Sequence, residues 1–209
     1  EYDIPLPTTL NQAEKDELCT VEQRLTTALD IQKAPREAVS KAYNVFQKAR
    51  IQRSGTGFIG APILTPDELD RSKGEISWND LETMLSGFAY DTYYNHSETS
   101  RKNYFTVWDF AIDQGFSFGS GMGTNHHYGY QVRKIYTTAW LMRDAIWKAP
   151  NRDNILSTLI FWSALQETRQ PYQYGRDELL DSWHTLLMAK TVSALLFTCL
   201  LYTSDAADE

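Results

Sequence analysis

Cysteine, long apolar runs and positive charge are all scarce in this sequence of 209 residues. Its two cysteines, Cys19 and Cys199, are too few for a disulfide framework or a four-ligand zinc pattern. The apolar run at residues 192–202 is too short to cross a bilayer. The formal net charge of −7 argues against a broad nucleic-acid-binding surface. A local basic cleft could still hold an anion, because salt screens the more distant charges.

Some enzyme signatures are absent as well, whereas aromatic residues are plentiful. The chain contains no phosphate-cradling P-loop and no H-E-x-x-H zinc motif. Aromatic residues make up 13% of it, with six Trp and twelve Tyr. They fit either a core built from large side chains or a carbohydrate cleft in which flat rings stack on sugars.

Helical periodicity dominates the rest of the sequence. Apolar residues recur at helical spacing near residues 18–29, 38–49, 81–88, 104–112, 132–139, 155–160 and 180–195. The alternation of apolar and polar residues that is typical of strands is almost absent, and no tandem repeat is visible. We therefore predict an all-α chain of roughly seven helices in the style of a helical toroid or array. The glycine-rich residues 54–65 and 115–129 are predicted to be loops.

Three proline or cap signals place boundaries along the chain. Residues 1–10 include Pro5 and Pro7 and are expected to be extended. Pro35 stands where the first turn of a helix tolerates proline. Ser77, with Asp80 three residues on, is similar to a capping box and predicts the start of another helix.

The segment Gly121–Tyr130 differs from everything around it. Imidazoles, an amide and phenols gather within six residues of this predicted loop: Asn125, His126, His127, Tyr128 and Tyr130. Loops between rigid helices often carry catalytic groups, and paired imidazoles can act as base, acid or hydrogen-bond donor near neutral pH. A polar loop whose histidines only satisfy backbone carbonyls is the alternative. A zinc site is disfavoured because adjacent histidines tend to point apart and no acidic partner accompanies them.

Other polar residues are weaker candidates. Arg133 follows the segment directly, and its guanidinium could meet a carboxylate or a sulfate, although a solvated helix face explains it equally well. His184 lies beside Trp183 on a predicted apolar helix and is interpreted as structural. His96 is expected in a helix-entry turn.

These motifs resemble the catalytic domain of chondroitinase ABC lyases, polysaccharide lyase family 8. The resemblance rests on Asp113-Gln114-Gly115-Phe116, on His126-His127-x-Gly129-Tyr130 and on Leu141-Met142-x-Asp144. It runs from about residue 4 to residue 198 and includes Ile4-Pro5-Leu6-Pro7, which in such enzymes follows an N-terminal β-sandwich. The His-His-x-Gly-Tyr motif is its most specific part.

The resemblance implies a partial α/α toroid of helical hairpins, in an incomplete catalytic domain that cleaves chondroitin and dermatan sulfate by elimination. Elimination needs a group that neutralises the uronate carboxylate, a base for the C5 proton and an acid for the departing O4. In the family, a Tyr–His pair, an Arg and a Glu further along carry much of this work, so this chain alone is expected to be inactive. The resemblance implies a catalytic role for His126 or His127, with Asn125, Tyr130 and Arg133 binding substrate.

The expected domain plan has three parts. Residues 1–11 form a connector after a missing β-sandwich, residues 12–198 form the partial toroid, and residues 199–209 form a tail that resembles a translated sequencing adapter. The resemblance implies a secreted or periplasmic bacterial protein with a glycosaminoglycan substrate and a monomeric parent; no nucleic-acid partner and no membrane span are expected. No cofactor is evident, although a divalent cation, Ca²⁺ or Mg²⁺, stays open for the parent.

Two other classes of function compete with this hypothesis. One is a non-catalytic helical module that binds acidic polysaccharide. The other is a hydrolase with two carboxylates flanking its cleft, which is disfavoured because the segment Gly121–Tyr130 contains histidine and no acid.

Overall fold

The computed structural model of the chain describes residues 11–13, 16–17, 19–21, 23–24, 36–61, 63–64, 76–114, 126–167 and 192. The chain divides into two compact units, Glu1–Lys33 and Ala34–Glu209. In the first unit the described residues between 12 and 24 are helical. The Gln12 amide donates to the Asp16 carboxylate over 2.9 Å, an i,i+4 contact that supports this helix.

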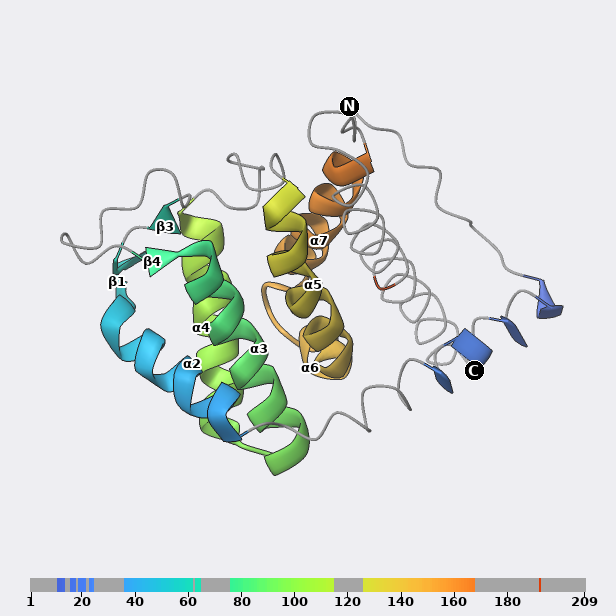
Figure 1. Ribbon diagram of the computed structural model, residues 1–209, viewed down its shortest axis with the longest axis horizontal. Coiled ribbons are helices and arrows are strands. Elements are labelled where there is room, and N and C mark those ends of the chain that lie inside the picture. The colour runs from blue at the N-terminus through green and yellow to red at the C-terminus, as the bar shows by residue number, and fades with distance from the viewer. Residues whose placement is uncertain are drawn as a thin grey trace. The chain divides into compact units, whose positions relative to one another are not determined.

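Helices also dominate the second unit, with four short strands between the first two of them (Figure 1). In chain order the elements are α2 (Arg36–Ala49), β1 (Gln52–Ser54), β2 (Gly57–Ile59), β3 (Ile63–Leu64), β4 (Ile76–Ser77), α3 (Trp78–Asn95), α4 (Glu98–Asp113), α5 (His126–Leu141), α6 (Arg143–Trp147) and α7 (Arg152–Glu167). The prediction of a mostly helical chain is therefore confirmed. The closure of the helices into a toroid stays a prediction.

Helix α3 packs against α2, α4 and α5 and supplies much of the core (Figure 1). Its predicted apolar stripe is fully buried: Leu81, Met84, Leu85 and Phe88 are each 0% exposed. Two rings of α2, Tyr43 and Phe46, meet Phe88 edge-on with centroids 5.1 and 5.4 Å apart. Each such aromatic pair contributes about 1 kcal/mol beyond the area that it buries.

The predicted helix start at Ser77 is confirmed. Helix α2 is described from Arg36 onwards, and Pro35, predicted in its first turn, lies outside the described residues. At the start of α3 the Ser77 hydroxyl accepts from the Asp80 N–H over 3.2 Å, and the Asp80 carboxylate accepts from the Ser77 N–H over 2.8 Å, which completes the capping box. His96 lies in the short turn between α3 and α4, with a left-handed φ of 55°.

The prediction of a plain loop over residues 54–65 is wrong. Strands β1 and β2 form an antiparallel hairpin with Ser54 opposite Gly57, and β3 pairs with β4 in parallel. The hairpin turn depends on Gly55, which adopts a φ of 60° at the first of two central positions, as type II′ turns require. Strands of two or three residues are too short for alternation to reveal them in a sequence.

Hydrogen bonds tie the helices of this unit together. The Tyr43 hydroxyl of α2 and the Ser100 hydroxyl of α4 lie 2.7 Å apart, and Ser100 also donates to Asp91 of α3. The Tyr136 hydroxyl of α5 donates to the Leu159 carbonyl of α7. These bonds satisfy polar groups that the packing of the helices would otherwise bury unpaired.

The end of the chain is described at one position only, Val192, which is helical and 0% exposed. The rest of the helix predicted near residues 180–195, together with His184 and the predicted tail, lies outside the described residues. Within the part of the chain that the structure describes, no helix is long and apolar enough to span a membrane.

Candidate functional site

The two candidate histidines begin a helix rather than end a loop. The glycine-rich pattern predicts a loop up to residue 129, but α5 begins at His126, so the predicted boundary is wrong. The apolar stripe at Val132, Ile135 and Ala139 continues backwards to Tyr128, four residues before Val132, and supports one more helical turn. Gly129 costs that turn about 1 kcal/mol relative to Ala, which is too little to prevent it.

The register of α5 sorts the candidate residues into two lines along the helix. Successive positions differ by about 100° around a helix axis, so the positions of His126, Tyr130 and Arg133 share one line. The position of His127 lies on a neighbouring line with Lys134, seven residues further on. Three of the five predicted site residues therefore fall on one line of α5. Asn125 lies outside the described residues.

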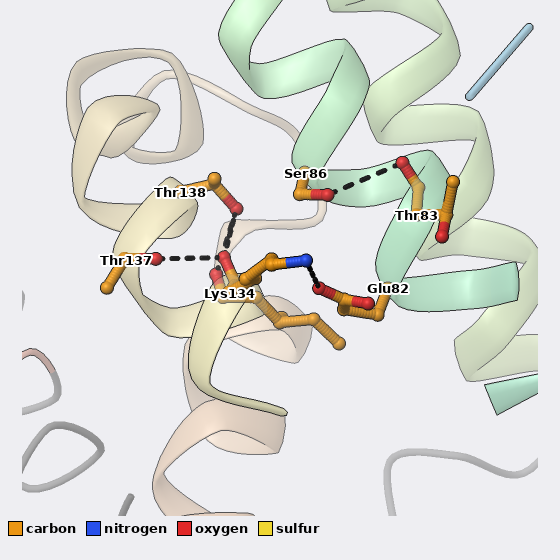
Figure 2. A network of polar contacts seen from close by, with 7 residues as sticks. Glu82, Thr83, Ser86, Lys134, Thr137 and Thr138 are labelled. Carbon is orange, nitrogen blue, oxygen red and sulfur yellow. Dashed lines mark hydrogen bonds and ion pairs between the residues drawn. The ribbon is translucent and has the colours of Figure 1, made fainter. Parts of the chain in front are cut away.

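An ion pair joins the second of these lines to α3 (Figure 2). The Lys134 ammonium Nζ lies 3.2 Å from Oε1 of Glu82. Around the backbone of the same lysine, the Thr138 and Thr137 hydroxyls donate to the Lys134 carbonyl over 2.6 and 3.2 Å. On α3, the Ser86 hydroxyl donates to the Thr83 carbonyl over 3.4 Å. The contact between α3 and α5 thus contains a polar network, about two helical turns along α5 from the histidine pair.

The two partners of this ion pair differ in exposure. The side chain of Glu82 is 9% exposed, whereas that of Lys134 is 57% exposed. Two neighbouring hydroxyl residues, Ser86 and Thr138, are also buried. An isolated buried carboxylate costs several kcal/mol, and the Lys134 ammonium offsets part of that cost for Glu82. Glu82 could not be predicted from the sequence, because a single Glu in a helical stripe carries no signal of its partner.

A second polar cluster lies near the end of α4. The Asp113 carboxylate accepts from the Phe58 N–H over 2.9 Å and so holds the β1–β2 hairpin against α4. One turn earlier, burial raises the pKa of the Asp109 carboxyl, and a hydrogen bond from Asn151 and the charge of Arg53 oppose that rise only in part. We assign Asp113, which lies in one of the family-like motifs, a structural contact with the hairpin.

One catalytic motif, G-x-S-x-G, is matched in the sequence but not in its structural context. Residues 115–119 read Gly-Phe-Ser-Phe-Gly and so match G-x-S-x-G, but they lie outside the described residues. The nucleophile elbow of that motif follows a strand, whereas these residues follow helix α4. Within the described residues no three His, Cys, Asp or Glu side chains gather in a way that could hold a metal ion.

Comparison with known proteins identifies the family of the chain. A sequence model of the family described as "Lyase, catalytic" matches residues 4–199. The chain belongs to this lyase family. It is therefore related to an enzyme catalytic domain, and the helices described above are part of that domain.

Two curated relatives come from bacteria. The chain is 31% identical to the chondroitin sulfate ABC exolyase of Bacteroides thetaiotaomicron over 110 residues, which are 49% of this chain and 11% of the relative. It is 33% identical to the chondroitin sulfate ABC endolyase of Proteus vulgaris over 87 residues, which are 41% of this chain and 8% of that relative. The matched segment thus spans about a tenth of each relative, and the resemblance to chondroitinase ABC lyases is confirmed at the level of this domain.

Proposed function

We propose that the chain supplies part of the catalytic domain of a lyase that cleaves chondroitin and dermatan sulfate at uronic acid. The observation that carries the proposal is the histidine pair in the first turn of α5, in a chain that the lyase family matches over residues 4–199. The names of the two relatives supply the substrate class. A secreted or periplasmic location and a monomeric parent belong to the same proposal.

The start of a helix suits an anionic sugar. Its first N–H groups have no partner within the helix, and the positive end of the helix dipole attracts carboxylates and sulfates. His126 begins α5, and Arg133 follows on the same line two turns later. In the proposal, Asn125, Tyr130 and Arg133 hold the uronate residue beside the two imidazoles.

One of the two histidines takes part in proton transfer at the uronate. A base removes the C5 proton, the C4–O4 bond breaks, and the electron pair forms a C4–C5 double bond while the departing O4 receives a proton. His126 and His127 are about 100° apart around α5, so the two imidazoles cannot serve this step equally. Because the matched relatives are about ten times longer than the segment that they share with it, we propose that the chain alone binds substrate without turning it over.

The decisive experiment measures the absorbance of newly formed C4–C5 unsaturation with chondroitin and dermatan sulfate as substrates. In the longer parent protein, His126→Ala and His127→Ala should have unequal effects, and the more damaging change should lower kcat by roughly 100-fold or more on at least one substrate. The purified 209-residue chain should bind both polysaccharides and give no absorbance change. Full activity in both variants would show that the histidines are structural, and a parent that binds without cleaving would indicate a non-catalytic binding module.

A further inference from the structure

We propose that the junction of α6 and α7 is a second contact for the polysaccharide, at which Arg143, Lys148 and Arg152 bind its sulfate and carboxylate groups. This inference rests on the function proposed above, because that function supplies the polyanion. Helix α6 lies at the end of α5 that is farther from His126 (Figure 1). Helix α5 is about 24 Å long, so the second contact lies several sugar residues along the polymer from the histidine pair.

The sequence around this junction is basic, although the chain as a whole is acidic. The net charge of the chain is −7, yet residues 114–152 contain five Lys or Arg and one acidic residue, Asp144. The five basic residues are Arg133, Lys134, Arg143, Lys148 and Arg152. A polyanion that is repelled by the average charge of the chain is therefore attracted to this part of it, because salt screens the charges that lie further away.

Two of these cations lie over tryptophan rings. The guanidinium carbon Cζ of Arg143 is 4.6 Å from the centroid of the Trp140 ring, and that of Arg152 is 4.3 Å from the centroid of the Trp147 ring. A ring against the guanidinium limits the freedom of a long side chain, so less entropy is lost when the side chain binds an anion. The N–H donors of the planar group remain able to form paired bonds to a sulfate or a carboxylate.

The two tryptophans lie on one side of a nearly continuous helix. Met142 joins α5 to α6, because its N–H donates to the Thr138 carbonyl over 3.1 Å and its carbonyl accepts from the Ile146 N–H over 2.8 Å. The positions of Trp140 and Trp147 are seven residues apart, so they lie within about 20° of the same line and about 10 Å apart along it. Two arginines held on this line can contact separate anionic groups of one polymer.

The three cations also keep most of their donors available within the described residues. Nη1 of Arg143 donates to the Trp140 carbonyl over 3.0 Å, and Nε of Arg152 lies 3.1 Å from the Asp153 carboxylate. The Asp153 side chain is 85% exposed, and an ion pair this exposed is weak. Lys148 is exposed and forms no ion pair in the part of the chain that the structure describes. An incoming sulfate therefore displaces little at this junction.

Helix stability explains two of the three cations but not the third. Arg143 bonds a carbonyl in the last turn of α5, and Lys148 follows the last residue of α6, so both lie where a cation favours the helix dipole. Arg152 instead begins α7, where a positive charge opposes the dipole. A role in binding an anion accounts for a cation at this place, so Arg152 is the residue on which the proposal is tested.

The test measures binding of polymeric chondroitin sulfate to the 209-residue chain by isothermal titration calorimetry at low salt. Arg152→Gln should weaken binding by about fivefold. Arg101→Gln is a closely matched control, because Arg101 is also 42% exposed and its Nε also pairs with a nearby carboxylate, that of Glu98 over 2.9 Å. It should leave the affinity unchanged. Should Arg152→Gln fail to fold, Lys148→Gln, which changes an exposed side chain, should weaken binding in the same way.

NMR of the chain with isotopically labelled tryptophan shows where the polymer binds. The indole resonance of the half-buried Trp147 should shift on addition of chondroitin sulfate, whereas that of the fully buried Trp108 should not. Equal affinities of Arg152→Gln and Arg101→Gln, or an unshifted Trp147 in a chain that binds the polymer, would overturn this second contact and leave the proposed function standing.

Kinetics of the longer parent protein separate the two proposals in the other direction. Arg152→Gln should raise KM for the polymer by about fivefold with kcat unchanged, because the contact lies away from the reacting bond. Loss of kcat with KM unchanged would contradict a binding role. A parent that binds the polymer through Arg152 without cleaving it would overturn the proposed function and leave the second contact in place.

Discussion

Asp91 and Asp109 are both half-buried carboxylates, but their surroundings change their pKa values in opposite directions. At Asp91, burial favours the protonated form, yet hydrogen bonds from Ser100, Asn95 and Ser97 outweigh burial and lower the pKa. At Asp109, burial is the dominant cause and raises the pKa. The two residues should therefore contribute to stability with opposite dependence on pH.

The sign for each residue follows from proton binding. The folded state holds the proton of Asp91 less tightly than the unfolded state does, so its stabilisation is present above the ordinary Asp pKa and is lost as pH falls through the lowered value. The folded state holds the proton of Asp109 more tightly. Its charged form therefore costs stability, and this cost appears as pH rises from the ordinary pKa through the raised one.

We expect Asp91→Asn to lower the free energy of unfolding at pH 7 by about 1 kcal/mol, allowing for solvent screening of a partly exposed group. Asp109→Asn should raise the free energy of unfolding at pH 7, because it removes a charge whose burial is unfavourable. The Asp109 difference should shrink toward pH 4, whereas the Asp91 difference should persist at pH 4 and shrink only at lower pH. Urea unfolding followed by circular dichroism at pH 3, 4, 5.5 and 7 measures them, with the exposed Asp144→Asn as the control. The same sign for both variants at pH 7 would contradict this account.

At the scale of elements, the close approach of α2 and α3 depends on Gly87. A Cβ atom at this position would lie 2.5 Å from the Cβ of Ala42 and 2.6 Å from the Ala38 carbonyl oxygen. Alanine improves intrinsic helix propensity by about 1 kcal/mol, but the clash involves backbone that cannot move alone. The clash should therefore outweigh the propensity and force the two helices apart.

We expect Gly87→Ala to lower the free energy of unfolding by about 1–2 kcal/mol, as overpacking of a core typically does. Urea denaturation of the chain measures the change. Gly57→Ala is the control, because its added Cβ would meet only the Asp113 carboxylate, at 3.0 Å, so at most the exposed hydrogen bond from the Phe58 N–H to Asp113 would be lost. Equal losses of unfolding free energy in the two variants would show that the backbone contact between α2 and α3 does not cause the destabilisation by Gly87→Ala.

The elements also show what the sequence could and could not predict. Helix α3 was predictable because Ser77 and Asp80 signal its start locally and Leu81, Met84, Leu85 and Phe88 mark its buried face. The start of α5 was missed because Gly129 and the preceding glycines suggested a loop, although the helical stripe extends past them. Glu82 and Lys134 meet only through the packing of α3 on α5, and no local pattern reports a contact between distant segments.

At the scale of the whole molecule, a net charge of −7 opposes the approach of a sulfated polysaccharide. Binding must then rely on a few cations that contact the polymer directly, and in the proposal Arg133 is one of them. Each such contact displaces counterions from the polyanion, so the affinity should fall as salt rises. If the affinity comes instead from sugars that stack on aromatic rings, it should rise with salt, because salt screens the repulsion between the negatively charged chain and the polyanion.

We expect the affinity of the 209-residue chain for chondroitin sulfate to fall between 50 and 300 mM NaCl, as measured by isothermal titration calorimetry. Arg133→Gln should weaken binding by about fivefold at low salt, which corresponds to about 1 kcal/mol for the loss of one ionic contact. It should also flatten the dependence on salt, since one fewer ion is exchanged. Arg101→Gln is the matched control, because Arg101 is half-exposed on α4 and pairs with Glu98 over 2.9 Å. Equal effects of the two substitutions, or an affinity that rises with salt, would remove Arg133 from the binding site and favour stacking as the source of affinity.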